Sequence, residues 1–321
     1  MTVVFNPTDL RKLYTPPPNS SGEDNGQVTI IAGSELFHGA PLLATTLASR
    51  IVDMVFFTSP YKPMKDIANK VKSKLFSFIW VPFNEVERYI EKSDAILIGP
   101  GFMRYKTEKN EQKAQQNGFV HFLKKQKYDS AARKSRRITE YLLKEFPHKK
   151  WVIDGGSLQS MEASWIPEGA IITPNKKEFQ MLFNKSIVIP DSDPESDSSV
   201  HEERRMPDQA RHDDLMKLVE TQSRKYKCII VLKGPTTIVS DGKETVLVEG
   251  GNAGLTKGGT GDVLAGLTVA FLAKNEPLLA ACTGSYVIKY AADEIYKERG
   301  TFYNADDVAM RIPQTLHELL G

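Results

Sequence analysis

Short, continuous runs of apolar and β-branched residues recur along the chain, and segments with helical periodicity separate many of them. Continuous apolar runs of this length are typical of strands that are buried on both faces of a parallel sheet. The predicted strands are 28–32, 52–58, 78–81, 95–98, 151–154, 170–173 and 229–233. The predicted helices are 40–50, 131–146, 207–225, 262–274, 277–297 and 305–320. The alternation predicts an α/β protein with a layered α/β/α fold, in which helices cover both faces of a mostly parallel central sheet.

Two apolar runs near the middle of the second half break the parallel pattern. Residues 237–240 and 245–248 flank Asp241-Gly242-Lys243, a sequence that favours a tight turn. The two runs therefore predict an antiparallel hairpin at one side of the sheet.

Two charged segments interrupt the regular pattern. Residues 104–137 carry eleven Lys or Arg and three Asp or Glu, whereas residues 191–214, within a second insertion over 186–214, carry nine acids and three Arg. We interpret both as surface insertions with irregular structure. Aromatic residues are not regularly interleaved with the basic charges, so a solvated insertion is favoured over a nucleic-acid contact.

Length and composition narrow the class of protein. The 321 residues suit one large α/β domain or two modest ones, and we expect a lead-in over 1–25 followed by a single catalytic domain over 26–321. The 42 basic and 40 acidic residues give a net charge of +2, which predicts no nucleic-acid or membrane partner. The two cysteines exclude a disulfide framework or a Cys-rich zinc site. Because no signal peptide or membrane span is recognisable, we expect a cytoplasmic protein.

The strongest chemical signal is the glycine-rich segment from Asn252 to Gly266. Gly258, Gly259 and Gly261 permit a sharp turn, and a helical pattern begins immediately after it. Free amide groups at that helix start form an anion hole for a phosphate, and Asp262 beside them is a candidate general base. The alternative is a plain glycine-rich turn with an ordinary acid in the first helical turn. The spacing does not match a Walker loop.

A second signal is Lys233, which ends an apolar strand and begins the turn Lys233-Gly-Pro-Thr-Thr237. Ligands of α/β sheets bind at the carboxyl ends of strands, so this lysine is placed to contact phosphate. Four more strand ends carry glycine or polar residues: Gly33-Ser34 with His38-Gly-Ala-Pro41, Gly99-Pro-Gly101, Asp154-Gly-Gly156 and Thr173-Pro-Asn175. Each alone is ordinary turn chemistry. Together they predict a binding site along one edge of the sheet. The histidines show no metal-ligand spacing, so no protein-bound metal is predicted.

These motifs, taken in order, resemble the ADP/ATP-dependent NAD(P)H-hydrate dehydratases of the ribokinase-like superfamily. The resemblance covers roughly residues 25–295 outside the charged insertions. It rests on Gly33-Ser34, His38-Gly-Ala-Pro41, Ile98-Gly-Pro-Gly101, Ile153-Asp154, Thr173-Pro-Asn175 with Glu178-Phe179, Lys233-Gly-Pro-Thr-Thr237, and Asn252 with Gly258-Gly-Thr-Gly-Asp262. One departure is Asp154-Gly-Gly156, where the family usually has Asp-Ala-Asp.

The resemblance implies repair of hydrated NADH or NADPH. ADP or ATP, with Mg²⁺, would phosphorylate the ring hydroxyl, and phosphate would then be eliminated. It implies that Ala40, Gly101 and Asn175 contact the hydrated dinucleotide and that Asp262 acts at the reacting hydroxyl. The implied nucleotide contacts are Lys233, Gly234, Pro235, Thr236, Thr237, Gly258, Gly259, Thr260 and Gly261. The expected partners are this small-molecule substrate, further copies of the chain in a homo-oligomer, and a separate epimerase of the same pathway.

Two other functions fit the same motifs. A ribokinase-like kinase acting on a small alcohol, such as a vitamin precursor or a sugar, would use Asp262 and the anion hole but release a stable phosphate ester. A nucleotide-binding regulator would need no base, so Asp262 and Lys233 count against it. Assaying hydrated NADH against small alcohols separates the two enzymes.

Overall fold

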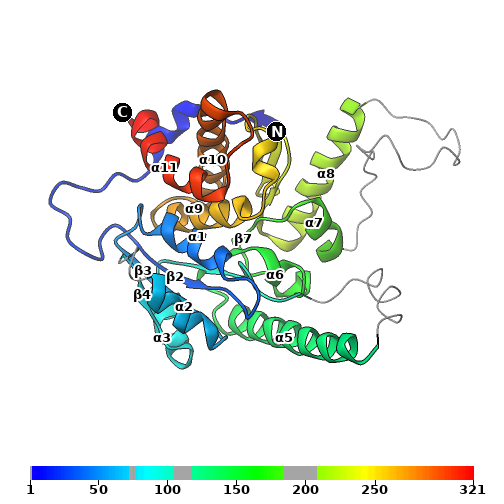
Figure 1. The fold of residues 1–321 in the computed structure, drawn as a ribbon. Helices are drawn as coiled ribbons and strands as arrows, with labels where there is room; N and C mark the ends of the chain where they lie inside the picture. Colours follow the sequence, from blue (N-terminus) through cyan, green and yellow to red (C-terminus); the bar gives the residue numbers. More distant parts are fainter. Residues whose placement is uncertain (1, 72–74, 76, 105–117, 184–207) are drawn as a thin grey trace, which may run out of the picture.

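The computed structural model describes residues 2–71, 75, 77–104, 118–183 and 208–321, and its centre is one ten-stranded sheet (Figure 1). The strands are β1 (Thr2–Val4), β2 (Gln27–Ile31), β3 (Met54–Thr58), β4 (Ile79–Trp80), β5 (Ala95–Ile98), β6 (Lys150–Ile153), β7 (Ile171–Ile172), β8 (Ile229–Leu232), β9 (Thr237–Ser240) and β10 (Thr245–Val248). Their order is β1-β10-β9-β8-β7-β6-β5-β2-β3-β4. All seven predicted strands are therefore present, most of them shorter than expected.

Strand directions bring the predicted motifs to one edge. Every neighbouring pair from β8 to β4 is parallel, so the carboxyl ends of these strands lie along the same side of the sheet. Strand β9 is antiparallel to both β8 and β10, which confirms the predicted hairpin. Its turn is closed by Asp241, whose Oδ1 accepts hydrogen bonds from the main-chain N–H groups of Lys243 and Glu244.

Helices cover both faces of the sheet, as the sequence pattern predicts (Figure 1). Along β5, Ala95 and Leu97 belong to one apolar core, whereas Ile96 and Ile98 belong to the other. The first core is packed by α1 (Gly39–Ala48), α9 (Thr260–Lys274), α10 (Pro277–Arg299) and α11 (Ala305–Leu320). The second is packed by α3 (Val86–Lys92), α5 (Gly118–Glu145), α6 (Gly155–Leu158), α7 (Lys176–Phe183) and α8 (Asp208–Tyr226). Helix α2 (Pro63–Val71) contributes Met64 to the first core.

Helix α9, which starts at the glycine-rich turn, is the most buried helix on its face of the sheet. From Val263 to Ala273 every residue is buried, because α1, α10 and α11 enclose the helix. Gly266 permits this packing: a Cβ atom there would lie 2.7 Å from the Ala44 main chain of α1. The start of α9 is thus fixed against the sheet edge by packing along its whole length.

The first residues of the chain are part of the sheet, which differs from the predicted lead-in. Strand β1 pairs in parallel with β10, and the 3₁₀ turn η1 (Pro7–Lys12) follows it. Phe5 contributes to the apolar core and packs on Tyr286 of α10 at 5.2 Å between ring centroids. The prediction missed this strand because three residues give too short a pattern to show periodicity.

The first charged insertion also differs from its prediction. Helix α5 begins at Gly118, so the predicted helix over 131–146 is present but starts earlier, and an irregular loop is wrong for residues 118–130. Long straight-chain residues such as Lys, Gln and Leu favour helix, and extending an existing helix is easier than starting one. Phe102 and Met103, which precede this insertion, and Ala132, near its end, are buried in the core. Residues 105–117 and 186–207 of the two insertions lie outside the described residues, and 208–214 begin α8.

Among the described helices none is long and apolar enough to cross a membrane. The cytoplasmic location stays a prediction.

Candidate functional site

Three strand ends meet at the predicted edge of the sheet. The main-chain N–H of Lys233, just after β8, donates to the carbonyl of Pro174 at 2.9 Å, and Asn175 and Lys233 form an isolated bridge. Asp154 follows β6, and its Oδ1 accepts a hydrogen bond of 2.7 Å from the hydroxyl of Thr173. The sequence motifs that follow β6, β7 and β8 are therefore one site.

A buried ion pair lies at the centre of this site. The ammonium Nζ of Lys233 is 2.9 Å from Oδ1 of Asp154 and 3.9 Å from Oε2 of Glu178. Burial opposes the charged form of Lys233, but attraction to Asp154 and Glu178 outweighs it and raises the pKa of the lysine. A Cβ atom at Gly261 would lie 3.4 Å from this Nζ, so the ammonium group rests against the first turn of α9.

Glu178 is held by the start of helix α7. Its main-chain N–H donates to Oδ1 of Asn175, and its own Oε2 accepts from the N–H of Asn175, both at 2.9 Å. Gln159 donates to its other carboxylate oxygen at 2.8 Å. Burial raises the pKa of Glu178, although Lys233 opposes the rise. The reciprocal cap fixes both Asn175 and Glu178 beside the lysine.

Asp262 lies in the first turn of α9, next to this ion pair. The N-cap of α9 is Gly259, whose φ of 97° is in the left-handed region, so Asp262 does not cap the helix. Within the described residues no side-chain hydrogen bond reaches Asp262. Burial raises its pKa to about 7, with repulsion from Asp154 adding to the rise and Lys233 opposing it. The carboxyl group is thus free to exchange a proton near neutral pH.

A cavity of about 590 Å³ opens beside Lys233 and Gly261. It lies between the strand-end turn after β8, the segment before α9, and α10. Apolar side chains form part of its wall, including Leu255, Leu264 and Ile288. The predicted site residues that line it are Asn175, Lys233, Gly234, Pro235, Thr237, Thr260 and Gly261. Its size and mixed wall suit part of a small ligand that carries both a ring and charged groups.

Three residues of the predicted phosphate turns do not line this cavity: Thr236, Gly258 and Gly259. Thr236 is half-buried between Pro235 and Thr237, and Gly258 is exposed with open space where a Cβ would point. Gly259 lies against Leu43 and Ala305, because a Cβ atom added at this glycine would be 2.7 Å and 2.8 Å from their side chains. Thr260 uses its hydroxyl to bond the carbonyls of Leu255 and Lys257 at 2.7 Å and 2.9 Å. Thr260 therefore closes the loop before α9.

The predicted dinucleotide contacts differ in whether they line this cavity. Gly101 lies against the start of α1, because a Cβ there would be 2.9 Å from the Phe37 carbonyl and 3.3 Å from Cβ of Ala40. Its φ of 70° also favours glycine. Asn175 lies instead at the cavity beside Lys233. Of the three, Asn175 lines the cavity, whereas Ala40 and Gly101 lie together at the start of α1.

Two residues of α10 belong to the site and were not predicted. Lys289 is buried at 5% exposure and lines the cavity. Asp293, one turn later, accepts hydrogen bonds from the main-chain N–H of Gly251 and from the amide of Asn252, at 2.8 Å and 3.0 Å. Asn252 also receives the hydroxyl of Tyr303 at 2.6 Å. A lysine inside the otherwise apolar stretch before Ala291 is the signal that could have indicated Lys289.

The sequence predicts no metal ion held by protein side chains alone. Among the residues that the structure describes, no group of three or more His, Cys, Asp or Glu side chains is placed to hold a metal ion. His38 starts α1 without capping it, and its Nε2 is buried without a hydrogen-bond partner.

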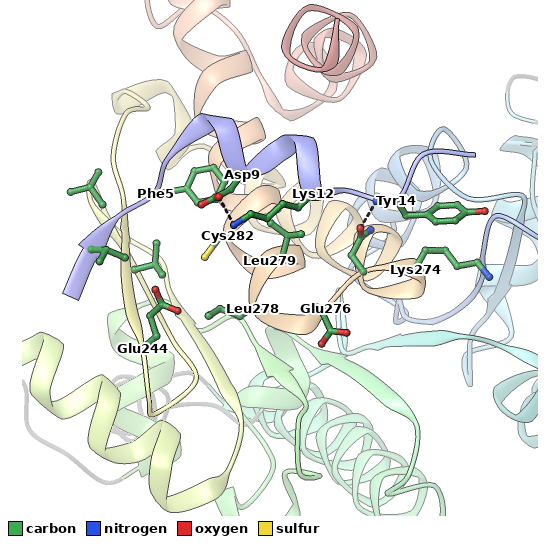
Figure 2. A pocket seen from close by; sticks show the side chains of 14 residues that line it. Phe5, Asp9, Lys12, Tyr14, Glu244, Lys274, Glu276, Leu278, Leu279 and Cys282 are labelled. Atoms are coloured by element: carbon green, nitrogen blue, oxygen red, sulfur yellow. Dashed lines mark hydrogen bonds and ion pairs between the residues drawn. The ribbon is translucent and has the colours of Figure 1, made fainter. Parts of the chain in front are cut away.

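A second cavity, of about 580 Å³, lies at the far end of α9 (Figure 2). The N-terminal segment, β10 and the start of α10 form it, and its charged side chains carry both signs, with Lys12 paired to Asp9 at 2.7 Å. None of the predicted site residues lines it. The candidate site is therefore the cavity at the start of α9.

Comparison with known families and relatives points to one chemistry. A family model described as NAD(P)H-hydrate dehydratase matches residues 28–314. The chain is 30% identical over 318 residues to the bifunctional NAD(P)H-hydrate repair enzyme Nnr of Methanocaldococcus jannaschii, covering 96% of this chain but only 51% of that protein. It is 25% identical to the ADP-dependent (S)-NAD(P)H-hydrate dehydratase of Cenarchaeum symbiosum, covering 96% of this chain and 94% of that protein.

Solved structures show the same fold. A ribokinase-like superfamily protein from Enterococcus faecalis has a TM-score of 0.71 at 19% identity, covering 99% of this chain and 96% of that chain. The ADP/ATP-dependent NAD(P)H-hydrate dehydratase from Bacillus subtilis, co-crystallised with ATP and Mg²⁺, has a TM-score of 0.69 at 16% identity, covering 99% and 98%. The predicted ribokinase-like α/β fold is confirmed.

Proposed function

Because this chain belongs to the NAD(P)H-hydrate dehydratase family, we propose that it removes water from hydrated NADH or NADPH with ADP or ATP as the phosphoryl donor. The observation that carries the proposal is Asp262 in the first turn of α9, beside Lys233 and directly after Gly261, which lines a cavity of about 590 Å³. A proton acceptor and an anion-binding helix start meet at this point.

The nucleotide occupies the cavity in this proposal. Its base packs on the apolar wall formed by Leu255, Leu264 and Ile288. Its terminal phosphate reaches the start of α9, where the main-chain N–H groups near Gly261 have no partners within the helix. The hydrated nicotinamide ring approaches from the side of Ala40 and Gly101, which border the start of α1.

Asp262 then acts as the general base. Its carboxylate accepts the proton of the ring hydroxyl, and the hydroxyl oxygen forms a bond to the transferred phosphorus atom. The bond between that phosphorus and the departing nucleotide breaks. In the second step the carbon–oxygen bond breaks and phosphate leaves with the oxygen. The adjacent ring carbon releases a proton to water, and the electron pair of that carbon–hydrogen bond restores the ring double bond. The helix amides and Lys233 stabilise negative charge as it develops.

Mg²⁺ fits this site as a companion of the phosphates. Carboxylate and phosphate oxygens are the ligands that Mg²⁺ prefers, and Asp154, Glu178 and Asp262 place more negative than positive charge around Lys233. Bound there, the ion would neutralise phosphate charge. Both oxygens of Glu178 already accept hydrogen bonds, so the open oxygens are those of Asp262 and Oδ2 of Asp154.

The remaining partners are part of the proposal. The Methanocaldococcus relative is named bifunctional and is about twice as long as the matched segment. We propose that a separate epimerase interconverts the hydrate epimers for this chain, and that the chain forms a homo-oligomer.

The test is an assay of purified protein with hydrated NADH, Mg²⁺ and either ADP or ATP. Regain of the near-ultraviolet absorbance of NADH, with release of phosphate, supports the proposal. Phosphorylation of a small alcohol without repair of hydrated NADH favours the kinase instead. Binding of nucleotide without either reaction favours a regulator.

A further inference from the structure

Lys289 is a buried lysine of α10, and among the described residues no carboxylate lies at hydrogen-bond distance from its ammonium group. Its Nζ donates to three main-chain carbonyls: those of Gly234 at 3.3 Å, Gly250 at 2.9 Å, and Pro235. An ammonium group has three N–H donors, so all of them are used. The ammonium group of Lys289 therefore binds the protein backbone, and no N–H donor remains for a ligand.

The three carbonyls come from two loops that are separated in the chain. Gly234 and Pro235 belong to the turn between β8 and β9, whereas Gly250 belongs to the segment between β10 and the 3₁₀ turn η4 (Ala253–Thr256). Both loops line the cavity assigned to the nucleotide. Lys289 thus joins the two walls of that cavity through a single nitrogen atom.

The backbone around Lys289 is shaped for this contact. Gly250 and Gly251 have φ angles of 88° and 80°, which side-chain-bearing residues rarely adopt. A Cβ at Gly251 would lie 3.0 Å from Cγ of Lys289, so the loop approaches the lysine stem closely. Asp293 holds the same loop from the next turn of α10 through the N–H of Gly251. Contacts with α10 therefore fix the position of this loop.

Electrostatics explain why a cation is needed there. Three converging carbonyl oxygens repel one another, and they also repel any phosphate that approaches the cavity. Burial lowers the pKa of Lys289 to about 8, with attraction from Asp293 and Glu249 opposing the change, so the ammonium form prevails at neutral pH. Replacing that form would leave buried acceptors without a donor.

We propose that Lys289 is a positioning residue that assembles the nucleotide pocket by clamping the β8–β9 turn to the β10–η4 loop. This inference rests on the proposed function, because it takes the cavity to be the nucleotide site. Lys289 acts through the two loops and touches neither the reacting hydroxyl nor the transferred phosphate.

Lys289→Met tests the proposal, since it keeps most of the stem and removes the three donors. We expect the Kd for ADP and ATP, measured by calorimetry, to rise about 10- to 100-fold, the scale of lost hydrogen bonds from a charged group. We expect kcat at saturating nucleotide to change less than about threefold. Lys297→Met is the matched control, because Lys297 lies on the same helix, is exposed, and forms a surface ion pair with Glu294 at 2.6 Å. It should leave both quantities unchanged.

Chemical rescue separates positioning from general destabilisation. Lys289→Ala should show the same rise in Kd. Propylammonium should restore its nucleotide affinity, because the added ion refills the carbonyl site, and should leave the affinity of Lys297→Met unchanged. If Lys289→Met does not fold, the rescued Lys289→Ala variant provides the same test.

The outcomes distinguish the inference from the proposed function. A wild-type protein that binds neither ADP nor ATP contradicts the proposed function. A wild-type protein that binds nucleotide while Lys289→Met binds it equally well contradicts the role of Lys289 alone. Loss of kcat without a change in Kd also contradicts it, because it would place Lys289 in the chemical step.

Discussion

Two lysines line the same cavity, Lys233 half-buried and Lys289 buried, and the groups around them differ. Lys233 lies among the carboxylates of Asp154 and Glu178, which raise its pKa, whereas Lys289 lies among backbone carbonyls and burial lowers its pKa to about 8. The region around Lys233 contains ionisable carboxylates that can interact with a substrate. The region around Lys289 satisfies its charge entirely with main-chain oxygens. The comparison shows that a lysine's partners, more than its location in a pocket, indicate its role.

The acidic region gives the largest predicted effect. Asp262→Asn keeps the shape of the side chain and removes the proton acceptor, so kcat should fall about 10²- to 10⁴-fold while nucleotide affinity is retained. Steady-state kinetics and calorimetry on the same preparation measure both. Near-normal turnover would make Asp262 an ordinary acid of the first helical turn and would remove the chemical distinction between the two regions.

The second largest effect is expected from substitution of Lys233, the cation among these carboxylates. Lys233→Met should weaken nucleotide binding by about 1–3 kcal/mol, the scale of a lost charge-assisted hydrogen bond. It should also lower kcat, unlike Lys289→Met, because it leaves the nearby carboxylates without a counter-charge. Lys177→Met is the control, since Lys177 is exposed on α7. Unchanged affinity and unchanged kcat would limit Lys233 to a structural role.

The smallest effect concerns stability. The pKa of Asp262 rises from 3.8 to about 7 on folding, so the folded state binds more protons than the unfolded state between these values. Stability is therefore lost as pH rises through this window. Asp262→Asn should match the wild type near pH 4 and exceed it at pH 8 by about 1–3 kcal/mol.

Thermal unfolding at several pH values checks this prediction. Asp306→Asn is the matched control, because Asp306 also lies in a first helical turn but is exposed. A stability difference for Asp262→Asn that does not depend on pH would show that burial of the carboxylate costs the fold nothing.

Much of this fold follows from local pattern. Buried parallel strands are continuous apolar runs, and the motifs at their ends converge because parallel strands end at one edge. The Lys233 turn and the glycine-rich turn before Asp262 could therefore be assigned to one site from the sequence. Strand β1 could not, because its three residues pair with β10 only through long-range contacts.

Side-chain partners were harder to predict than backbone positions. Lys289 has no local motif, since its three acceptors come from two loops far away in the chain. The glycine at position 156 has a steric reason that the sequence does not show: a Cβ there would lie 2.2 Å from the carbonyl oxygen of Phe102. An aspartate at position 156, where the family usually has one, would therefore not fit this backbone.

The most direct test of the account is the pH dependence of kcat/KM. Asp262 must be ionised to accept the substrate proton, and burial raises its pKa to about 7, so activity should fall as pH decreases below about 7. Lys233 lowers the pKa of Asp262, so this limb should move to higher pH in Lys233→Met and stay in place in Lys289→Met. A rate that does not change with pH between about 5.5 and 8 in the wild type, or a limb that Lys233→Met does not move, would contradict the assignment of Asp262 as the base beside Lys233.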